Sequence, residues 1–347
     1  MLTTGVWRHA QRLPAVAPEH RISLGEGGTP LVPLPRWGAA LGLARAFAKL
    51  EYANPTGSFK DRGMSVLVSL AKQMGAQHLT EDSSGNAGAA AAAYAARAGM
   101  TCTVYAPESA PAAKLRQIRA YGAELVLVPG ARSAVTQAAR DAGTAPGSYY
   151  VAHTENADFL HGNQAFAWEL TEAWQGGGFG AAPSEVRAWH VVTPAGGGAL
   201  LQGAWLGFTA DRKAYGSLGL PLPQVHGAQA AAVAPLARAF ELGLDEPAPI
   251  EPRPTVCGGI QLERPAHGRE ILRAIRESGG SAVASEDDAV LREHDRLAQL
   301  EGIYCEPTSA AALAGLAQLA AGGRIAADEI VVVAITGSGL KDPGPQA

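Results

Sequence analysis

Short apolar runs alternate with longer amphipathic segments along most of this 347-residue chain. The apolar runs are rich in β-branched or aromatic side chains, as is typical of strands buried in a parallel sheet. They cover residues 101–106, 124–129, 148–152, 188–193, 224–228 and 329–336. The segments between them predict helices at 58–75, 87–99, 112–122, 162–174, 230–242, 268–277 and 307–320. Strands that alternate with helices indicate an open, doubly wound α/β fold with mostly parallel sheets.

The composition excludes several classes of function. A hydrophobic fraction of 47% and a charged fraction of 17% are ordinary for a globular protein, and 347 residues allow two domains. The net charge of −4 offers no basic field for nucleic acid or anionic lipid. The first residues lack the apolar core of a signal peptide, and no apolar run is long enough to span a membrane. Cys102, Cys257 and Cys305 form no CxxC pair, so we expect buried thiols, no metal site and a soluble cytoplasmic protein.

The segment at 54–63 reads NPTGSFKDRG and places a lysine at the start of an expected helix. Pro55 and Gly57 favour a turn, and Ser58 is a good N-cap residue for the helix that follows. Lys60 then lies in the first helical turn, where a positive charge opposes the helix dipole instead of complementing it. Such a lysine is poorly placed for stability and well placed to act as an imine-forming amine. From this segment alone, a catalytic lysine and a solvated surface lysine are equally good interpretations.

Three further loops lie at strand ends, where ligands bind in doubly wound folds. The sequence SSGNAG at 83–88 precedes a helix, and its small hydroxyl residues and glycine suit an anion such as a carboxylate. Three glycines at 196–198 follow the strand at 188–193, and backbone amides there can converge on a phosphate. Thr336 ends the strand at 329–336. The alternatives for the first two loops are a plain serine N-cap and a glycine turn that binds nothing.

Taken in this order, these segments resemble the threonine synthase branch of the fold type II enzymes that use pyridoxal 5′-phosphate (PLP), the tryptophan synthase β-like group. NPTGSFKDRG is a highly specific motif of that group. The likeness covers nearly the whole chain and also includes GEGGTPL at 25–31, EPTSAAA at 306–312 and TGSGLKDP at 336–343.

The resemblance implies two doubly wound α/β domains. The larger, PLP-binding domain would comprise 1–60 and 156–347, and the smaller one would comprise 61–155. The active site would lie in the cleft between them. By analogy with the family, the protein would be a homodimer that acts on a small amino-acid substrate, with no nucleic-acid or membrane partner.

The resemblance also implies a role for each matched residue. Lys60 would bind PLP as a Schiff base and act as the catalytic base, and Phe59 would pack beside the cofactor. Asn86 would hydrogen-bond the 3-hydroxyl of PLP, and Thr336 would meet its pyridine nitrogen. The cofactor phosphate would be bound by Gly196, Gly197, Gly198 and Ala199. The amino-acid substrate would be bound by Ser83, Ser84, Gly85, Ala87, Lys114 and Thr154.

The chain departs from that family's pattern near the site for the substrate phosphate. The family commonly has NSxNPxRxxGQ where this chain reads HTENADFLHGN at 153–163, so Phe159 replaces an arginine that would clamp the phosphate. Leu200 replaces a second polar residue. His153 and His161 can replace part of the lost positive charge, whereas Phe159 makes that end of the pocket apolar.

The implied reaction is that of threonine synthase, in which O-phosphohomoserine and water give threonine and phosphate. Because the phosphate contacts are depleted, two alternatives stay open: a serine/threonine ammonia-lyase, or a β-replacement enzyme acting on an activated serine. A non-catalytic relative that binds PLP or a metabolite as a sensor is less compatible with the sequence, since a sensor has no need of an imine-forming Lys60.

Overall fold

The computed structural model describes residues 5–108, 110, 112–342 and 344, and the side chains of 112–114 are outside this description. The chain forms two compact units, and each is assembled from two separate segments. Unit 1 comprises Met1–Gly28 and Asn54–Ala165, and unit 2 comprises Thr29–Ala53 and Phe166–Ala347. None of the helices in this described part combines the length and the apolar character that a membrane crossing requires.

Unit 1 is built on a four-stranded parallel sheet in the order β5-β4-β3-β6. The strand order reverses between β3 and β6, which is the kind of switch point where doubly wound folds bind ligands. The strands are β3 (His78–Glu81), β4 (Thr101–Pro107), β5 (Glu124–Val128) and β6 (Ser148–Tyr150). The helices are α2 (Lys60–Gln73), α3 (Asn86–Ala98), α4 (Ala112–Ala120) and α5 (Arg132–Ala142), and α6 (Asp158–Gln175) begins in this unit.

The core of unit 1 depends on small side chains. The alanine-rich helix α3 is buried along most of its length and contacts α2, β3 and β4. Alanine is a strong helix former, and its single methyl group lets a helix approach its neighbours closely. Helix α2 is also buried on nearly every side, so the start of α2 is held in a fixed position.

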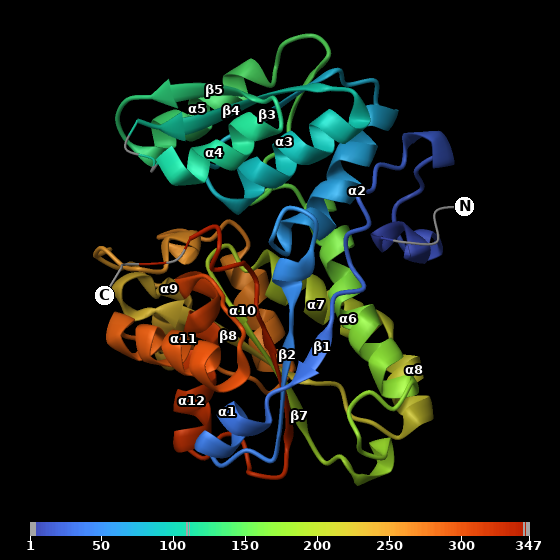
Figure 1. Ribbon diagram of the computed structural model, residues 1–347, viewed down its shortest axis with the longest axis vertical. Coiled ribbons are helices and arrows are strands. Elements are labelled where there is room, and N and C mark those ends of the chain that lie inside the picture. The colour runs from blue at the N-terminus through green and yellow to red at the C-terminus, as the bar shows by residue number, and fades with distance from the viewer. Residues whose placement is uncertain (1–4, 109, 111, 343, 345–347) are drawn as a thin grey trace. The chain divides into compact units, whose positions relative to one another are not determined.

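Unit 2 is built on a six-stranded sheet in the order β1-β2-β10-β7-β8-β9, in which β1 alone runs antiparallel to its neighbour. Figure 1 shows α11 and α12 on one side of this sheet and α7 and α8 on the other. The strands are β1 (Leu31–Pro33), β2 (Arg45–Lys49), β7 (Trp189–Pro194), β8 (Gln224–Ala230), β9 (Ala282–Ser285) and β10 (Ile330–Ala334). The helices are α1 (Pro35–Ala40), α7 (Ala199–Ala210), α8 (Arg212–Leu218), α9 (Pro235–Glu241), α10 (Gly268–Glu277), α11 (Asp287–Glu301) and α12 (Pro307–Ala321).

The central strands of unit 2 are β10 and β7, and every residue of both is buried. Their continuous apolar sequences are explained by this position, because helices cover both faces of a doubly wound sheet. Helix α12 packs closely on the sheet through a glycine, since a Cβ on Gly315 would lie 2.8 Å from the Cβ of Ala228 on β8. The strand order reverses between β7 and β10.

Each strand expected from the sequence is present, and the expected helices are present with small shifts at their ends. The helix expected at 230–242 is an exception, because it is divided into a 3₁₀ turn at Ala231–Val233 and the helix α9. Pro235 causes the break: Ala234 before it takes a non-helical conformation, and proline then starts a new helix. The sequence did not predict β1, β2, β3, β9, α1, α5, α8 and α11.

The two units also differ in extent from the expected domains at 61–155 and at 1–60 with 156–347. The N-terminal segment belongs to unit 1, where the Ile22 amide donates to the Ser69 hydroxyl at 2.8 Å and the Ser65 hydroxyl donates to the Ile22 carbonyl oxygen at 2.6 Å. The second boundary falls inside α6, between Ala165 and Phe166, and not in the loop before that helix.

Candidate active site

Lys60 is the first residue of α2, and its side chain lies close to two aromatic rings of unit 1. Its Nζ is 4.7 Å from the centroid of the Phe59 ring and 5.5 Å from that of the Phe159 ring. The turn before the helix is fixed by Asp61, whose carboxylate accepts hydrogen bonds from the Thr56 amide at 2.6 Å and from the Thr56 hydroxyl at 2.5 Å. The negative charge of Asp61 complements the helix dipole that Lys60 opposes.

The prediction that Ser58 caps this helix is wrong. No side chain caps α2, and the Ser58 hydroxyl is fully buried with no hydrogen-bond partner among the described residues. The hydrogen bonds that Thr56 donates to the Asp61 carboxylate fix the turn instead. A buried hydroxyl without a partner is costly unless it meets a ligand or water. Two positions before Lys60, such a hydroxyl is available to a bound ligand.

Phe159 is fully buried in unit 1, near the start of α2. Helices α2 and α6 approach each other closely there because both contribute a glycine. A Cβ on Gly63 would lie 2.6 Å from the Phe159 ring, and a Cβ on Gly162 would lie 1.9 Å from the carbonyl oxygen of Arg62. The position where the resembled family has an arginine therefore holds a tightly packed apolar ring beside Lys60.

The loop at 83–87 leads from β3 into the helix α3, whose N-cap residue is Gly85. No side chain caps this helix, so the alternative of a plain serine N-cap is wrong. The Gly85 amide donates to the Ser83 hydroxyl at 3.3 Å, while Ser84 and Asn86 are half-buried and Ala87 is buried. The first amide groups of a 13-residue helix are thus not used by a capping side chain and can bind an anion.

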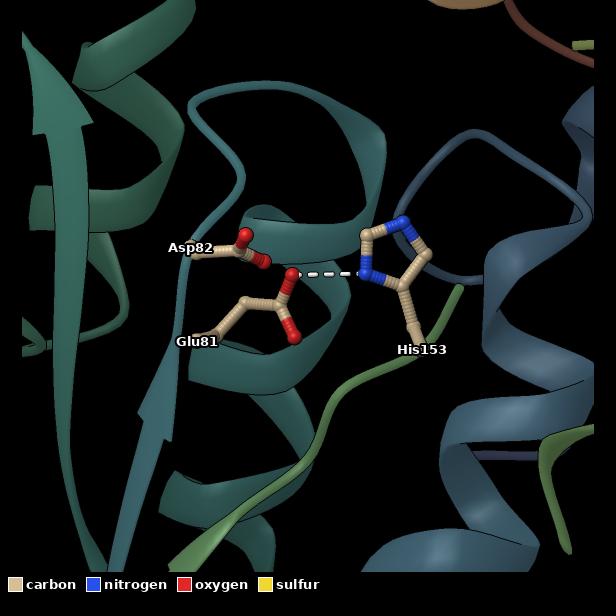
Figure 2. Close-up of side chains that lie close together, drawn as sticks. All are labelled: Glu81, Asp82 and His153. Atoms are coloured by element: carbon tan, nitrogen blue, oxygen red, sulfur yellow. Dashed lines mark hydrogen bonds and ion pairs between the residues drawn. The ribbon is translucent and has the colours of Figure 1, made fainter. Parts of the chain in front are cut away.

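Glu81, Asp82 and His153 lie together where the strand order of unit 1 reverses (Figure 2). Glu81 is the last residue of β3, and His153 follows β6, which pairs with β3 through Thr80 and Tyr150. The Nδ1 atom of His153 is 2.7 Å from Oε1 of Glu81, and both side chains are buried. Neither acid was predicted as a site residue, although both directly precede the SSGN sequence at 83–86.

The backbone before His153 takes an unusual conformation. Ala152 has a φ of 42°, and it is the one non-glycine residue with positive φ in the described part of the chain. Its carbonyl oxygen accepts hydrogen bonds from the amides of Glu155 and Asn156, both at 2.8 Å. Strained conformations of this kind persist only where the surrounding structure holds them, and they often occur at functional sites.

Asp82 is paired separately from Glu81 and His153. Its Oδ2 accepts a hydrogen bond from the Thr136 hydroxyl at 2.6 Å and lies 2.9 Å from the Arg132 guanidinium, both on α5. The remaining carboxylate oxygens of the cluster, Oε2 of Glu81 and Oδ1 of Asp82, are buried and have no hydrogen-bond partner among the described residues.

The two acids of this cluster differ in their affinity for a proton. Burial raises the pKa of Glu81 well above its ordinary value, and the negative charge of Asp82 adds to the rise. Burial also acts to raise the pKa of Asp82, but Arg132 and the hydrogen bond from Thr136 outweigh it and lower that pKa. The pKa of His153 is lowered well below its ordinary value, first by burial and then by the positive charge of Lys60. Both shifts act in the same sense: they favour the protonated carboxyl of Glu81 and the neutral imidazole of His153.

The lowered pKa of His153 favours its neutral form, so it speaks against the alternative in which His153 replaces part of a lost positive charge. His161 is 39% exposed, and its Nε2 lies 3.7 Å from the Asp158 carboxylate. Glu81, Asp82 and His153 offer atoms within 4.8 Å of one another that could coordinate a metal. Arg132 already places a positive charge near both carboxylates and Lys60 places one near Glu81; these charges oppose a further cation, so this arrangement is better suited to holding a proton.

In unit 2, the glycine loop and Thr336 lie at the same edge of the sheet. They follow β7 and β10, which are adjacent parallel strands that pair through Val192 and Val333. The Thr336 hydroxyl is buried and lies 3.0 Å from the Ser309 hydroxyl at the start of α12, which also accepts a hydrogen bond from the Gly337 amide at 2.9 Å. The reversal of strand order brings these two sequence-predicted sites together.

The glycine loop has the features of an anion site. It opens the 12-residue helix α7, which no side chain caps, and the Thr193 hydroxyl before it is buried without a partner among the described residues. Of the three glycines only Gly198 has a positive φ, of 67°. A Cβ on Gly196 would lie 2.8 Å from the Cα of Ile260, so packing already requires glycine there. These residues fit a phosphate at the start of α7.

The remaining predicted substrate residues are less well defined. Lys114 lies in α4, but its side chain is outside the described part of the structure. Thr154 is half-buried in the turn that follows His153. The structure thus brings together the candidates of unit 1 around the starts of α2 and α3 and the end of β6, and those of unit 2 around the ends of β7 and β10.

Comparison with known proteins shows which family the chain is similar to. Residues 22–337 match the family described as "Pyridoxal-phosphate dependent enzyme". The chain is 36% identical to the threonine synthase of Methanocaldococcus jannaschii, in an alignment that covers 98% of this chain and 81% of that protein. It is 34% identical to the threonine synthase of a Bacillus species, over 97% of this chain and 89% of that protein.

The fold is also shared with solved structures. The processed form of threonine deaminase isoform 2 from Solanum lycopersicum superposes with a TM-score of 0.75 at 18% identity, covering 96% of this chain and 86% of that one. At that level of identity the likeness concerns the fold alone. It confirms the expected fold type II architecture of α/β units with mostly parallel sheets.

Proposed function

The chain belongs to the family of pyridoxal-phosphate dependent enzymes, and from that premise we propose that it is a threonine synthase, which converts O-phosphohomoserine and water to threonine and phosphate. PLP is the cofactor of this family. The observation that carries the proposal is the near full-length identity with threonine synthases. The position of Lys60 in the first turn of a buried helix, close to two aromatic rings, supports it.

The roles of the residues follow from their surroundings. Lys60 forms the covalent link to PLP and moves the proton at Cα of the substrate. The substrate carboxylate binds the loop at 83–87, where no side chain caps α3. The cofactor phosphate binds the glycine loop at the start of α7. Asn86, at the start of α3, would hydrogen-bond the 3-hydroxyl of PLP.

Bound PLP supplies an electron sink for negative charge on the substrate carbons. Thr336 tunes that sink, because its hydroxyl is neutral and is already paired with Ser309. A neutral hydroxyl beside the pyridine nitrogen does not enforce its protonation, so Lys60 and its neighbours carry the proton transfers. The protein acts in the cytoplasm as a homodimer, as the family resemblance implies.

A second candidate function is favoured by one observation, the buried Phe159 ring beside Lys60. A ring cannot form the charge-assisted bonds by which arginine holds a phosphate. A serine/threonine ammonia-lyase, or a β-replacement enzyme acting on an activated serine, would have no need of them. In this second candidate function the other residues of the site keep the same roles.

One experiment separates these functions. The purified PLP-loaded protein is incubated in parallel with O-phosphohomoserine, L-serine, L-threonine and O-acetyl-L-serine, and phosphate, ammonia and new amino acids are measured. Threonine and phosphate in equal amounts from O-phosphohomoserine support the proposal. Ammonia from serine or threonine, with no threonine from O-phosphohomoserine, would replace it with the lyase. Absence of turnover with all four would indicate a non-catalytic relative.

A further inference from the structure

The pair of Glu81 and His153 is a feature of unit 1 that the proposed roles do not use. Both residues lie at the switch point of the unit 1 sheet, at the carboxyl ends of β3 and β6. The His153 ring also contacts Phe159, with ring centroids 5.9 Å apart, and the Lys60 amine lies 5.5 Å from the centroid of the same ring. His153 and Lys60 are therefore neighbours of one aromatic side chain.

The two nitrogens of His153 have different surroundings. Nδ1 is hydrogen-bonded to Glu81, whereas Nε2 has no hydrogen-bond partner among the described residues. A histidine that a carboxyl group holds by one nitrogen, with the other nitrogen left for a reacting group, is a recurrent arrangement for proton transfer. The resembled family commonly has asparagine at position 153, which can form hydrogen bonds but cannot transfer a proton at neutral pH.

We propose that His153, held by Glu81, is a second proton-transfer group beside Lys60. The inference rests on the proposed function, because elimination of a group from Cγ requires proton transfers at more than one carbon. The single amine of Lys60 holds one extra proton at a time. A second group that can deliver a proton while Lys60 retains the one it removed from Cα resolves this conflict.

The proton transfer balances within the pair. In the resting state Glu81 carries a proton and donates it in a hydrogen bond to Nδ1 of His153. The neutral imidazole has a single N–H proton, which is on Nε2. When the Nε2–H bond breaks and its proton passes to the substrate or leaving group, the proton of Glu81 moves to Nδ1. The imidazole stays neutral and Glu81 becomes a carboxylate. One proton taken up later, by the reverse path, restores the pair.

The charges around His153 agree with this resting state. Four charged or titratable groups act on it: Glu81 and Asp82 at the end of β3, Arg132 on α5, and Lys60 on α2. Burial lowers the pKa of His153 first; the positive charge of Arg132 lowers it further, as does that of Lys60 while its amine is not joined to PLP, against the opposing effect of Asp82. Burial raises the pKa of Glu81. These shifts favour a proton on Glu81 over one on His153, which is the arrangement that a loaded donor requires.

Two variants test the proposal in the PLP-loaded enzyme. Glu81→Gln keeps the shape and the hydrogen bond but has no proton to give, and His153→Asn installs the residue common in the resembled family. We expect each to lower kcat on O-phosphohomoserine about a hundredfold, with KM changed less than about twofold. Free imidazole should raise the rate of a His153→Ala variant at least about tenfold, which a merely structural histidine does not allow.

His190 supplies the matched control, because it is also a buried histidine bonded to a glutamate. Its Nε2 lies 3.0 Å from Glu329 in unit 2, at the amino end of β7. His190→Asn removes the same kind of hydrogen bond away from the predicted site residues, and it also affects the contact of Nδ1 with His226 at 3.0 Å. We expect this variant to keep the wild-type kcat at a temperature where it is folded.

A readout that needs no substrate separates this proposal from the proposed function. Nitrogen NMR of histidine-labelled PLP-loaded protein, assigned by the signals lost in His153→Asn, should show His153 neutral with its proton on Nε2 at pH 7. A charged imidazolium, or a proton on Nδ1, overturns the proposal. Wild-type kcat in Glu81→Gln or His153→Asn also overturns it. If O-phosphohomoserine is not converted at all, the proposed function fails and the NMR result decides the state of the pair.

Discussion

The amine of Lys60 lies 5.5 Å from the centroid of the buried Phe159 ring, at the position where an arginine would clamp a substrate phosphate in the resembled family. Lys60 belongs to the most specific motif of the sequence, and Phe159 is the clearest departure from the family pattern. The departure therefore lies next to the reacting amine. Variants at either residue should therefore report on the same small region of unit 1.

Lys60 is predicted to carry the cofactor. Borohydride reduction of the PLP-loaded protein should fix the cofactor on the peptide that contains Lys60, as mass spectrometry will show. Lys60→Ala should lose the covalent link and turnover while remaining folded, because a partly exposed lysine contributes little to stability. Lys72→Ala, on the same helix, is the control and should keep both properties. Recovery of the label on another lysine would assign the cofactor elsewhere.

Phe159→Arg is predicted to destabilise the protein. The guanidinium would enter a fully buried space that Gly63 bounds tightly and that lies beside the like charge of Lys60. Burial of an uncompensated charge should lower the free energy of unfolding by roughly 3–5 kcal/mol in urea titrations. Phe159→Leu, which stays apolar, should cost only about 1–2 kcal/mol. A stable Phe159→Arg variant with faster threonine formation would instead mean that position 159 reaches the substrate phosphate.

Gly197→Val is predicted to weaken PLP binding. Gly197 is not the glycine that needs a positive φ, which is Gly198, so the variant tests access to the loop more than backbone strain. Each charge-assisted hydrogen bond to a phosphate contributes about 1.5–3 kcal/mol, so loss of one raises Kd at least about tenfold. Gly216→Val is the control, because a Cβ at Gly216 meets open space. Fluorescence titration with PLP measures both, and equal Kd values would place the phosphate away from this loop.

The contribution of the Glu81–His153 pair to the free energy of unfolding is predicted to be highest at an intermediate pH. Burial raises the pKa of Glu81 and lowers that of His153, so the folded pair holds one proton across a wide range. In the unfolded chain Glu81 and His153 have their ordinary pKa values of 4.5 and 6.5. The pair then holds two protons below both values, one proton between them and none above both. Below 4.5 the unfolded state therefore binds more protons than the folded state, and above 6.5 it binds fewer.

The contribution of the pair to the free energy of unfolding should thus peak at about pH 5.5 and fall on both sides, with a limiting slope of about 1.4 kcal/mol per pH unit. Urea unfolding of the wild type and of the Glu81→Gln, His153→Asn double variant at a series of pH values measures this contribution as the difference between them. A difference that does not change with pH would show that the pair does not titrate between the two states.

The sequence predicted the fold because the strands of the buried sheets are continuous apolar runs. It missed β2 and β3, whose sequences RAFAK and HLTE contain charged residues. Those ionisable side chains have partners: Lys49 lies 2.6 Å from Glu169, and Glu81 is hydrogen-bonded to His153. Local apolarity cannot reveal a strand whose polar residues find partners far away in the sequence.

The residues of the candidate site likewise fall into those that the sequence predicted and those that it missed. Lys60, Gly198 and Thr336 were found because local motifs contain them, and each lies at the end of an element as expected. The hydrogen bond between Glu81 and His153 was not found, since it depends on the pairing of β3 with β6 across the switch point. The prediction that Ser58 caps α2 failed for a similar reason, because the hydrogen bond from the Thr56 amide to the Asp61 carboxylate decides the turn.

The position of β6 at the edge of the unit 1 sheet has a consequence for folding kinetics. Glu81 and His153 are 72 residues apart in sequence, and β6 is a three-residue strand that contacts the sheet only through β3. Contacts of such long range form slowly, because the chain must first close a large loop. The imidazole signal of His153 should therefore reach its native form only in the last kinetic phase of refolding, after the β3-β4-β5 segment has acquired protection from hydrogen exchange.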